Sequence, residues 1–268
     1  MDRTAIWIGD DRGPELRLAR RWLATIVPLV VHPDAASAID RHGPRPSLAL
    51  LACPRPGSWS VPAVARIAAA LPLVPLFAVT TSLAEGGRRN GDTLPGVEEI
   101  PWLELPGVAW RRWRPDVAEY RSLPATSRRD ERWLFRLPAG AAAGERVAVV
   151  ADTGGTEAVC DLLEAAGCTP HPLPGRRPVP GCVGPVVWAV GAVGEEQRQW
   201  LRLLTADGRR DVLVLESFPC GDGVVAALAA GAAAVLPRVV AADCLAGTLG
   251  WIAWRAAADA LGACAGGR

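Results

Sequence analysis

Residues 211–240 constrain the fold of this 268-residue chain more than any other stretch. They begin with four apolar residues, 212–215, which have the length and composition of a buried strand. An alanine-rich, helix-compatible stretch follows and stops at Gly231, and a second apolar run ends in Leu236, Pro237 and Arg238. A buried strand, a helix and another buried strand predict one repeat of a parallel sheet covered on both faces.

The same alternation runs through both halves of the chain. In the first half it predicts strands at 5–8, 29–31, 47–51, 74–79 and 96–103. It also predicts one helix that begins near residue 14, a second at 34–39 and a third at 61–70. Asp34 is the expected N-cap of the second helix. The glycine-rich residues 83–95 predict a fourth helix that is short or lost. In the second half it predicts strands at 146–150, 185–190, 212–215 and 233–236, and helices at 155–166, 195–204, 223–230 and 242–260.

Two α/β domains in tandem follow from this repetition, each with a doubly wound parallel sheet. The expected boundaries are residues 1–115 for the first domain, 116–144 for a linker and 145–268 for the second domain. Arginine and tryptophan are frequent on both sides of the first boundary, at 110–114 and 128–133. Acidic residues follow the first run and interrupt the second. This favours a solvated helix or linker that packs its tryptophans on the neighbouring domain, rather than a surface that binds nucleic acid.

Composition narrows the function classes. The chain has 29 arginines, no lysine and 28 acidic residues, so its net charge of +1 gives no general attraction to nucleic acid or to an anionic membrane. No apolar stretch approaches the length of a membrane span. Seven scattered cysteines without C-x-x-C spacing favour reduced thiols in a cytoplasmic protein. The three histidines lie far apart, so neither a metal site nor a bound cofactor is expected.

Residues 211–240, and less specifically residues 46–57, resemble the receiver domain of response regulators. In that family a helix ending in Gly-Ala leads into a strand that carries an essential lysine and then a cis-proline. Here Arg238 stands at the lysine position and Val239 at the proline position. The resemblance implies flavodoxin-like, receiver-like domains, in which two acids and a phosphoacceptor aspartate hold Mg²⁺ and a hydroxyl and a lysine bind the phosphoryl group.

In the first half, the resemblance puts Asp10 and Asp11 at the acidic pair, or Gly9 and Asp10 in the alternative register. It puts Ala52 at the phosphoacceptor position and Thr80 at the hydroxyl position, with Leu103 roughly at the lysine position. In the second half, the corresponding residues are Asp152 for the acidic pair, Gly191 for the acceptor, Glu216 for the hydroxyl and Arg238 for the lysine. Neither half keeps the full set, so phosphorylation by the usual route is not expected.

Glu216 and Arg238 would stand on neighbouring strand ends, where a salt bridge could replace the phosphoryl contact. The alternative is that both are ordinary exposed charges at strand ends. Receivers communicate through the face made by their fourth helix, fifth strand and fifth helix, which makes Leu228, Val235, Leu249, Trp251 and Trp254 candidates for an interaction face. The alternative is that most of these side chains belong to the core.

The function predicted by this resemblance is a non-enzymatic signalling or scaffold protein that acts through protein contacts. The two domains could pair with each other or form a homodimer. The alternative is a two-domain α/β enzyme that binds a nucleotide or small molecule in the inter-domain cleft near residues 152–156. There Asp152 follows a strand, and Gly155 and Thr156 open a helix whose N-terminus could hold a phosphate.

Overall fold

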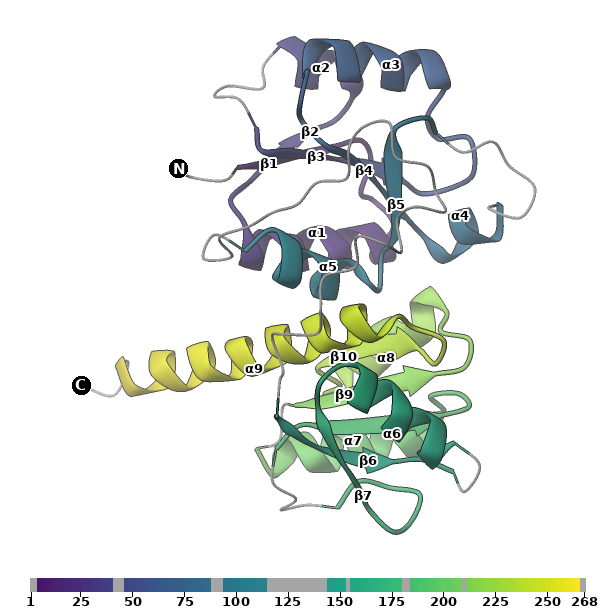
Figure 1. Ribbon diagram of the computed structural model, residues 1–268, viewed down its shortest axis with the longest axis vertical. Helices are drawn as coiled ribbons and strands as arrows, with labels where there is room; N and C mark the ends of the chain where they lie inside the picture. The colour runs from purple at the N-terminus through teal and green to yellow at the C-terminus, as the bar shows by residue number, and fades with distance from the viewer. Residues whose placement is uncertain are drawn as a thin grey trace. The chain divides into compact units, whose positions relative to one another are not determined.

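The structure is a computed structural model (Figure 1) that describes residues 4–40, 46–87, 94–114, 144–152, 155–179, 184–208 and 211–265. Within these ranges the side chains of 85–87 and 259–265 are not described. The chain divides into two compact units, Met1–Arg136 (unit 1) and Leu137–Arg268 (unit 2). The predicted linker, residues 116–144, lies outside the described residues apart from Gly144, which begins the described part of unit 2.

Unit 1 alternates strands and helices. Its strands are β1 (Ala5–Ile8), β2 (Leu29–His32), β3 (Leu48–Cys53), β4 (Leu76–Thr80) and β5 (Val97–Pro101). Its helices are α1 (Pro14–Ile26), α2 (Ala35–Asp40), α3 (Val61–Ala70), α4 (Ser82–Gly87) and α5 (Leu105–Arg112). All strand pairs are parallel, and the order across the sheet is β2-β1-β3-β4-β5. This is the strand order of flavodoxin-like folds.

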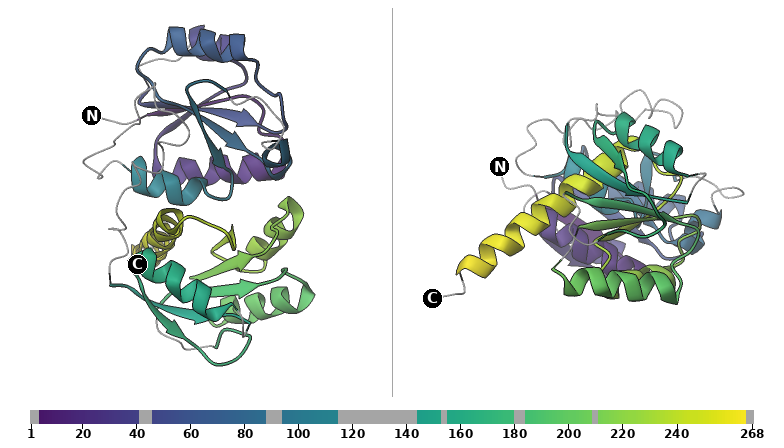
Figure 2. Two further views of the ribbon diagram at one scale, coloured as in Figure 1. Left: turned by 45° about the vertical axis from the view of Figure 1, so that its right-hand side comes forward. Right: turned by 90° about the horizontal axis from the view of Figure 1, so that it is seen from below.

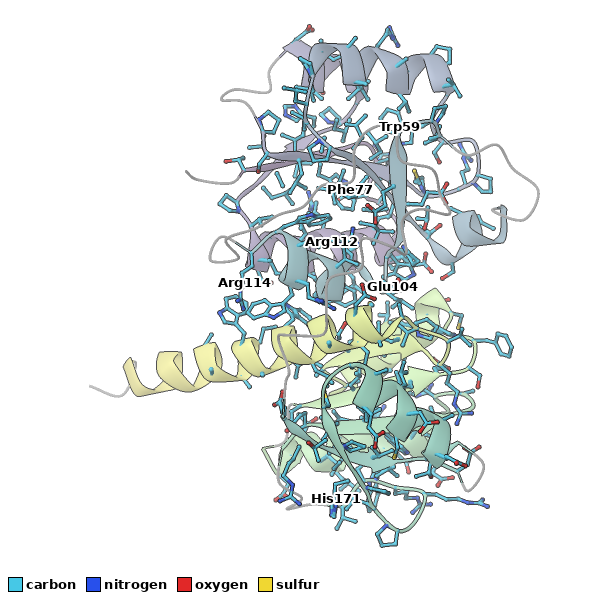
Figure 3. The ribbon with its side chains drawn as sticks, in the orientation of Figure 1. Trp59, Phe77, Glu104, Arg112, Arg114 and His171 are labelled. Carbon is cyan, nitrogen blue, oxygen red and sulfur yellow. The ribbon has the colours of Figure 1, made fainter. Side chains whose placement is uncertain are left out.

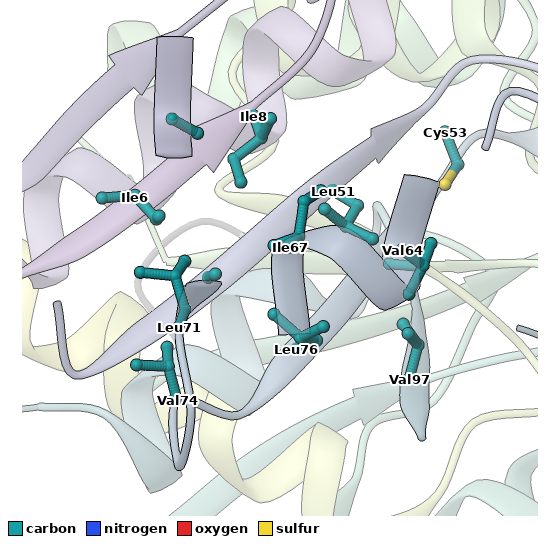
Figure 4. Packing of buried hydrophobic residues seen from close by; sticks show 13 residues of the cluster. Ile6, Ile8, Leu51, Cys53, Val64, Ile67, Leu71, Val74, Leu76 and Val97 are labelled. Carbon is teal, nitrogen blue, oxygen red and sulfur yellow. The ribbon is translucent and has the colours of Figure 1, made fainter. Parts of the chain in front are cut away.

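Helices cover both faces of the unit 1 sheet (Figure 1): α2 and α3 pack together on one face, and α1 and α5 on the other. On the α3 face, Ile8 and Leu51 of the sheet pack with Val64 and Ile67 of the helix (Figure 4). The three central strands are buried along their whole length, as expected of a parallel sheet with two covered faces.

The opposite face of the unit 1 sheet is rich in aromatic side chains. Trp22 of α1 stacks on Trp102, which follows β5, with ring centroids 5.9 Å apart. Phe77 of β4 contacts Trp113 at 4.8 Å in a tilted arrangement. Trp113 belongs to the arginine- and tryptophan-rich run that begins at residue 110, and it is buried. That part of the run therefore completes the core of unit 1.

Unit 2 repeats this architecture. Its strands are β6 (Arg146–Val150), β7 (Thr169–Pro172), β8 (Val186–Val190), β9 (Val212–Glu216) and β10 (Ala234–Pro237). Its helices are α6 (Thr156–Ala165), α7 (Glu195–Ala206), α8 (Gly221–Ala229) and α9 (Ala242–Ala265). All strand pairs are again parallel, and the order across the sheet is β7-β6-β8-β9-β10. Each strand of unit 2 thus has the place of the unit 1 strand whose number is lower by five. In Figure 2, α6 and α9 lie on one face of this sheet, and α7 and α8 on the other.

The predicted α/β class with a parallel sheet in each half is confirmed, and each described sheet has five strands. Strand 5–8 and helix 61–70 begin and end where the pattern predicts. Asp34 caps α2 as expected: its Oδ1 accepts the backbone N–H of Ser37 at 2.7 Å, and this hydrogen bond lowers the pKa of the Asp34 carboxyl. Within the described residues, the fourth helix is limited to the six residues of α4.

One strand was not predicted. β7 reads Thr-Pro-His-Pro, and two prolines in four residues argue against a strand because proline cannot donate to a ladder. β7 is the edge strand of its sheet and pairs only with β6, so it needs fewer backbone donors than a central strand. Among the described helices, none has both the length and the apolar character needed to cross a membrane.

Candidate functional site

The candidate sites lie at the carboxyl ends of the strands, and the strand pairing identifies equivalent positions in the two units. Thr80 pairs with Pro101 in unit 1, and Glu216 pairs with Pro237 in unit 2. The next backbone N–H then donates back across the pair: Trp102 to the Thr80 carbonyl at 2.9 Å, and Arg238 to the Glu216 carbonyl at 2.8 Å. Thr80 is therefore equivalent to Glu216, and Trp102 to Arg238.

This equivalence corrects the position predicted for unit 1. Leu103 lies one residue beyond the place that Arg238 occupies in unit 2, and the true counterpart of Arg238 is a tryptophan. The Trp102 ring is fully buried against Trp22 in the aromatic face of unit 1. Unit 1 therefore has a buried tryptophan where unit 2 has Arg238.

The first strands are matched in the same way. Ile8 pairs with Leu51, and Val150 pairs with Trp188 at the same level of the second sheet, so Asp10 and Asp152 occupy equivalent positions. The two predicted acceptor positions are not equivalent to each other. Ala52 pairs with Val79, one residue before Thr80, whereas Gly191 follows the end of its strand.

Arg238 makes an ion pair that was not predicted. Its Nη2 donates to Oδ1 of Asp152 at 2.9 Å, although the two residues are 86 positions apart in the sequence. β10 and β6 are separated by β9 and β8, and neighbouring strands lie about 4.8 Å apart. The Arg238 side chain therefore extends from β10 toward β6 along the carboxyl-end edge of the sheet.

Gly155 explains how this approach is possible. A Cβ on Gly155 would overlap the Nη2 of Arg238 and would lie 2.6 Å from Oδ1 of Asp152. Gly155 immediately precedes α6, and its own N–H donates to the Asp152 carbonyl at 2.8 Å. The missing side chain of Gly155 therefore makes room for the ion pair. Thr153 and Gly154 lie outside the described residues.

Glu216 does not pair with Arg238, so the predicted salt bridge between them is wrong. The Glu216 side chain turns inward and is 5% exposed. Its Oε1 accepts the backbone N–H of Val193, just before α7, at 2.9 Å. Its Oε2 is buried without a hydrogen-bond partner in the described structure. Arg238, in contrast, follows the strand and reaches the exposed carboxylate of Asp152 instead.

In unit 1 the acidic pair is held by nearby arginines. Asp10 accepts the backbone N–H of Arg12 at 2.9 Å and forms an exposed ion pair with its side chain. Asp11 forms an ion pair with Arg20 of α1 at 2.7 Å. Within the described residues, no three histidine, cysteine or acidic side chains are grouped closely enough to hold a metal ion.

Trp59 covers the predicted acceptor position of unit 1. Its indole Nε1 donates to the carbonyl of Ala52 at 2.8 Å. A Cβ on Gly9 would lie 3.2 Å both from the Ala52 side chain and from the Trp59 ring, so the three residues are packed together. Figure 3 labels Trp59 on the loop that precedes α3. The sequence gives no signal for this contact, because it depends on the path of the loop and not on a local pattern.

A hydrogen-bond network anchors the segment after β4 in unit 1. Thr80 is buried, and its hydroxyl donates to the Ile100 carbonyl at 3.4 Å. Glu15 of α1 accepts both the backbone N–H and the hydroxyl of Ser82, at 3.0 and 2.9 Å. The indole of Trp102 donates to the Ser82 hydroxyl at 3.3 Å. Sequence reasoning missed Glu15 and Ser82, which meet only because α1 packs beside the end of β4.

A buried thiol lies at the end of β3. Cys53 pairs with Thr80, one residue past Ala52. Burial, with a smaller contribution from the negative charge of Glu99, raises the pKa of the Cys53 thiol to about 12. The thiol therefore stays protonated at neutral pH and is not a nucleophile there.

Most of the candidate interaction face is buried. Val235, Leu249 and Trp251 are 1%, 0% and 0% exposed, so they are not available as a free surface. Leu228 is half-buried, and Trp254 is 40% exposed. The three buried side chains come from β10, a strand of the unit 2 sheet, and from the first half of α9, which packs on that sheet. The alternative interpretation, that these residues belong to the core, therefore applies to three of the five.

The fold and the site together define a class of protein: two α/β units with flavodoxin-like strand order, whose carboxyl-end edges carry charged and aromatic side chains. No protein-family model and no curated protein matches the chain.

Proposed function

We propose that the chain is a non-enzymatic signalling or scaffold protein built from two receiver-like domains that have lost phosphorylation. The proposal is supported first by the strand order that both units share with flavodoxin-like folds. Its second support is the resemblance of residues 211–240 to a receiver domain. Phosphate transfer would need a carboxylate nucleophile at the acceptor position, where unit 1 has Ala52 and unit 2 has Gly191.

The observation that carries the proposal is that the chain's own side chains occupy both carboxyl-end edges. In unit 2, Arg238 is bound to Asp152 and packs against Gly155. In unit 1, the Trp59 ring packs on Ala52 and its indole N–H uses the Ala52 carbonyl. A phosphoryl group would have to displace these contacts. Without the chemistry, the remaining use of such a domain is to present surfaces to other proteins.

Exposure to a small phosphodonor tests the loss of phosphorylation. After incubation with acetyl phosphate and Mg²⁺, we expect the intact mass of the chain to remain unchanged, while a phosphorylation-competent receiver treated in parallel gains one phosphoryl group. An added phosphoryl mass that is lost in mild base would contradict the proposal.

Two further measurements test the role in protein contacts. The chain should co-purify from its native host with a protein that also binds it when both are purified. A ligand that binds only the folded state raises the midpoint of thermal unfolding. Because we expect no nucleotide to bind, the midpoint should be unchanged in the presence of ATP, GTP or NAD. A saturable increase with any of these nucleotides would favour the alternative of a nucleotide-binding enzyme.

A further inference from the structure

Two large apolar side chains stand almost fully exposed at the carboxyl-end edge of the unit 2 sheet. Phe218 is 90% exposed and Val239 is 94% exposed. Each lies two residues beyond the last paired position of its strand, since Glu216 of β9 pairs with Pro237 of β10. They therefore leave neighbouring strands at the same level. Exposing a phenylalanine and a valine forgoes the free energy that their burial would provide.

Unit 1 shows that this exposure is not imposed by the fold. The residues equivalent to Phe218 and Val239, counted from the Thr80–Pro101 pair, are Ser82 and Leu103. Ser82 is half-buried and hydrogen-bonded to Glu15 and Trp102, and Leu103 is 6% exposed. The side chains at these two positions are thus buried or half-buried in unit 1 and almost fully exposed in unit 2.

The surroundings of Phe218 and Val239 are acidic. Asp152 follows β6, Glu157 lies in the first turn of α6, and Asp222 lies in the first turn of α8; all three are exposed. Glu216 adds a buried carboxylate whose Oε2 has no hydrogen-bond partner. The charge of Arg238 is balanced by Asp152, so the excess of exposed negative charge comes from Glu157 and Asp222. The edge therefore combines an apolar pair with an excess of carboxylates.

We propose that the carboxyl-end edge of the unit 2 sheet, formed by Phe218, Val239, Asp152 and Asp222, docks a segment of a partner protein that carries an arginine or lysine beside an apolar side chain. The proposal rests on the proposed function, because it assigns a surface to the protein contacts invoked there. Exposed aromatic side chains are frequent centres of binding energy in interfaces. A cationic side chain complements the exposed carboxylates of this edge.

The charge of this edge favours a different protein over the other possible occupants. In a two-fold symmetric pair of this chain the edge would face itself, which would bring carboxylates against carboxylates. Nucleic acid and anionic lipid surfaces would be repelled for the same reason. A basic, apolar segment has neither difficulty.

Selection from a random dodecapeptide library displayed on phage tests the proposal with the full-length chain as bait. We expect the enriched peptides to share an arginine or lysine next to a leucine, isoleucine, phenylalanine or tryptophan. The affinity of a synthetic peptide of the enriched sequence is then measured by fluorescence polarisation. It should weaken about tenfold or more in F218S and in V239S, as expected when a central interface side chain is removed.

Leu203 provides the matched control, because it is an apolar side chain of unit 2 that is 59% exposed on α7. L203S should bind the peptide as the wild type does. D222N should weaken binding and reduce its dependence on salt, since it removes an exposed charge. Thermal unfolding of every variant shows whether it is folded.

Several outcomes would overturn the proposal. They are the absence of enrichment, enrichment of acidic or uncharged peptides, and peptides that bind F218S, V239S and wild type equally. A wild-type dimer in sedimentation that dissociates in F218S would make a second copy the occupant instead. Any of these results leaves the scaffold function standing, whereas phosphoryl uptake or nucleotide binding would defeat that function whatever the peptides show.

Discussion

At the scale of single residues, glycines decide where this chain can approach itself. Gly231 ends α8 with a φ of +113°, and the following backbone makes the hydrogen bonds of a Schellman motif: Gly231 N–H to the Leu228 carbonyl at 3.0 Å and Ala232 N–H to the Ala227 carbonyl at 3.1 Å. A Cβ here would also overlap the hydroxyl of Thr205 on α7 and lie 2.9 Å from its Cβ. Both backbone conformation and packing require a glycine at this position.

Replacing Gly231 with alanine should therefore destabilise unit 2 by about 2–4 kcal/mol, the sum of a left-handed backbone penalty and overpacking. Gly208 is the matched control: its φ is +85°, but a Cβ there meets nothing within 4 Å. G208A should cost only the backbone term, about 1–2 kcal/mol. Chemical denaturation measures both. Equal costs for the two variants would mean that Thr205 moves aside freely.

The ion pair of Arg238 gives a second prediction at this scale. A double-mutant cycle of D152N and R238M should give a coupling energy of about 0.3–1 kcal/mol, the range of exposed pairs. A cycle of E216Q and R238M should give a smaller value, because Glu216 bonds to Val193 instead. The denaturation midpoints of the variants provide both couplings. A larger coupling for Glu216 would restore the pairing that the sequence predicted.

At the scale of elements, contacts between helices and strand ends hold the segment after β4 in unit 1. Glu15 of α1 accepts two hydrogen bonds from Ser82 at the start of α4. α4 has only six residues, and isolated helices of that length are not stable in water. Its position therefore depends on this carboxylate and on the contact between Trp102 and Ser82.

Replacing Glu15 with alanine should cost about 1–2 kcal/mol, as for the loss of a helix cap and of a charged hydrogen-bond acceptor. Hydrogen exchange should accelerate at the amide of Ser82, which donates to Glu15, and through α4. Asp10 serves as the control, since D10A removes an acid that is 56% exposed in its side chain and should change stability by less than about 0.5 kcal/mol. Unchanged exchange in E15A would show that α4 is held by other contacts.

At the scale of the whole molecule, each unit has its own five-stranded sheet, its own covering helices and its own buried residues. A parallel sheet covered on both faces is a complete folding unit, and domains of this size commonly fold alone. The chain therefore combines two units of one architecture whose carboxyl-end edges differ: the first is closed by Trp59, Ser82 and Leu103, and the second presents Phe218 and Val239.

Separate production of residues 1–136 and 137–268 should give two folded proteins. Each should show dispersed amide resonances and a single cooperative unfolding transition in denaturant. The slope of each transition should be smaller than the slope that an all-or-none unfolding of the full chain would require, because it scales with the surface exposed. A fragment without dispersed resonances would show that its core depends on the other unit.

Local patterns in the sequence predicted the order and type of most of the elements, although not strand β7 or helix α5. Apolar runs predicted nine of the ten strands in the described part of the chain, because each of these strands carries its own signal in the sequence. The exception, β7, has two prolines and is recognisable only once its place at the sheet edge is known. The repetition of the pattern in both halves also predicted two units.

The contacts at the site were decided by the tertiary structure. Arg238 meets Asp152 and not Glu216, Trp59 covers Ala52, and Glu15 reaches Ser82. Parallel strands carry the ends of distant segments to one edge, so residue types at this edge can be predicted from sequence. Which of them touch depends on whether each side chain turns into the core or along the edge, and that choice is made by packing against elements far away in the sequence.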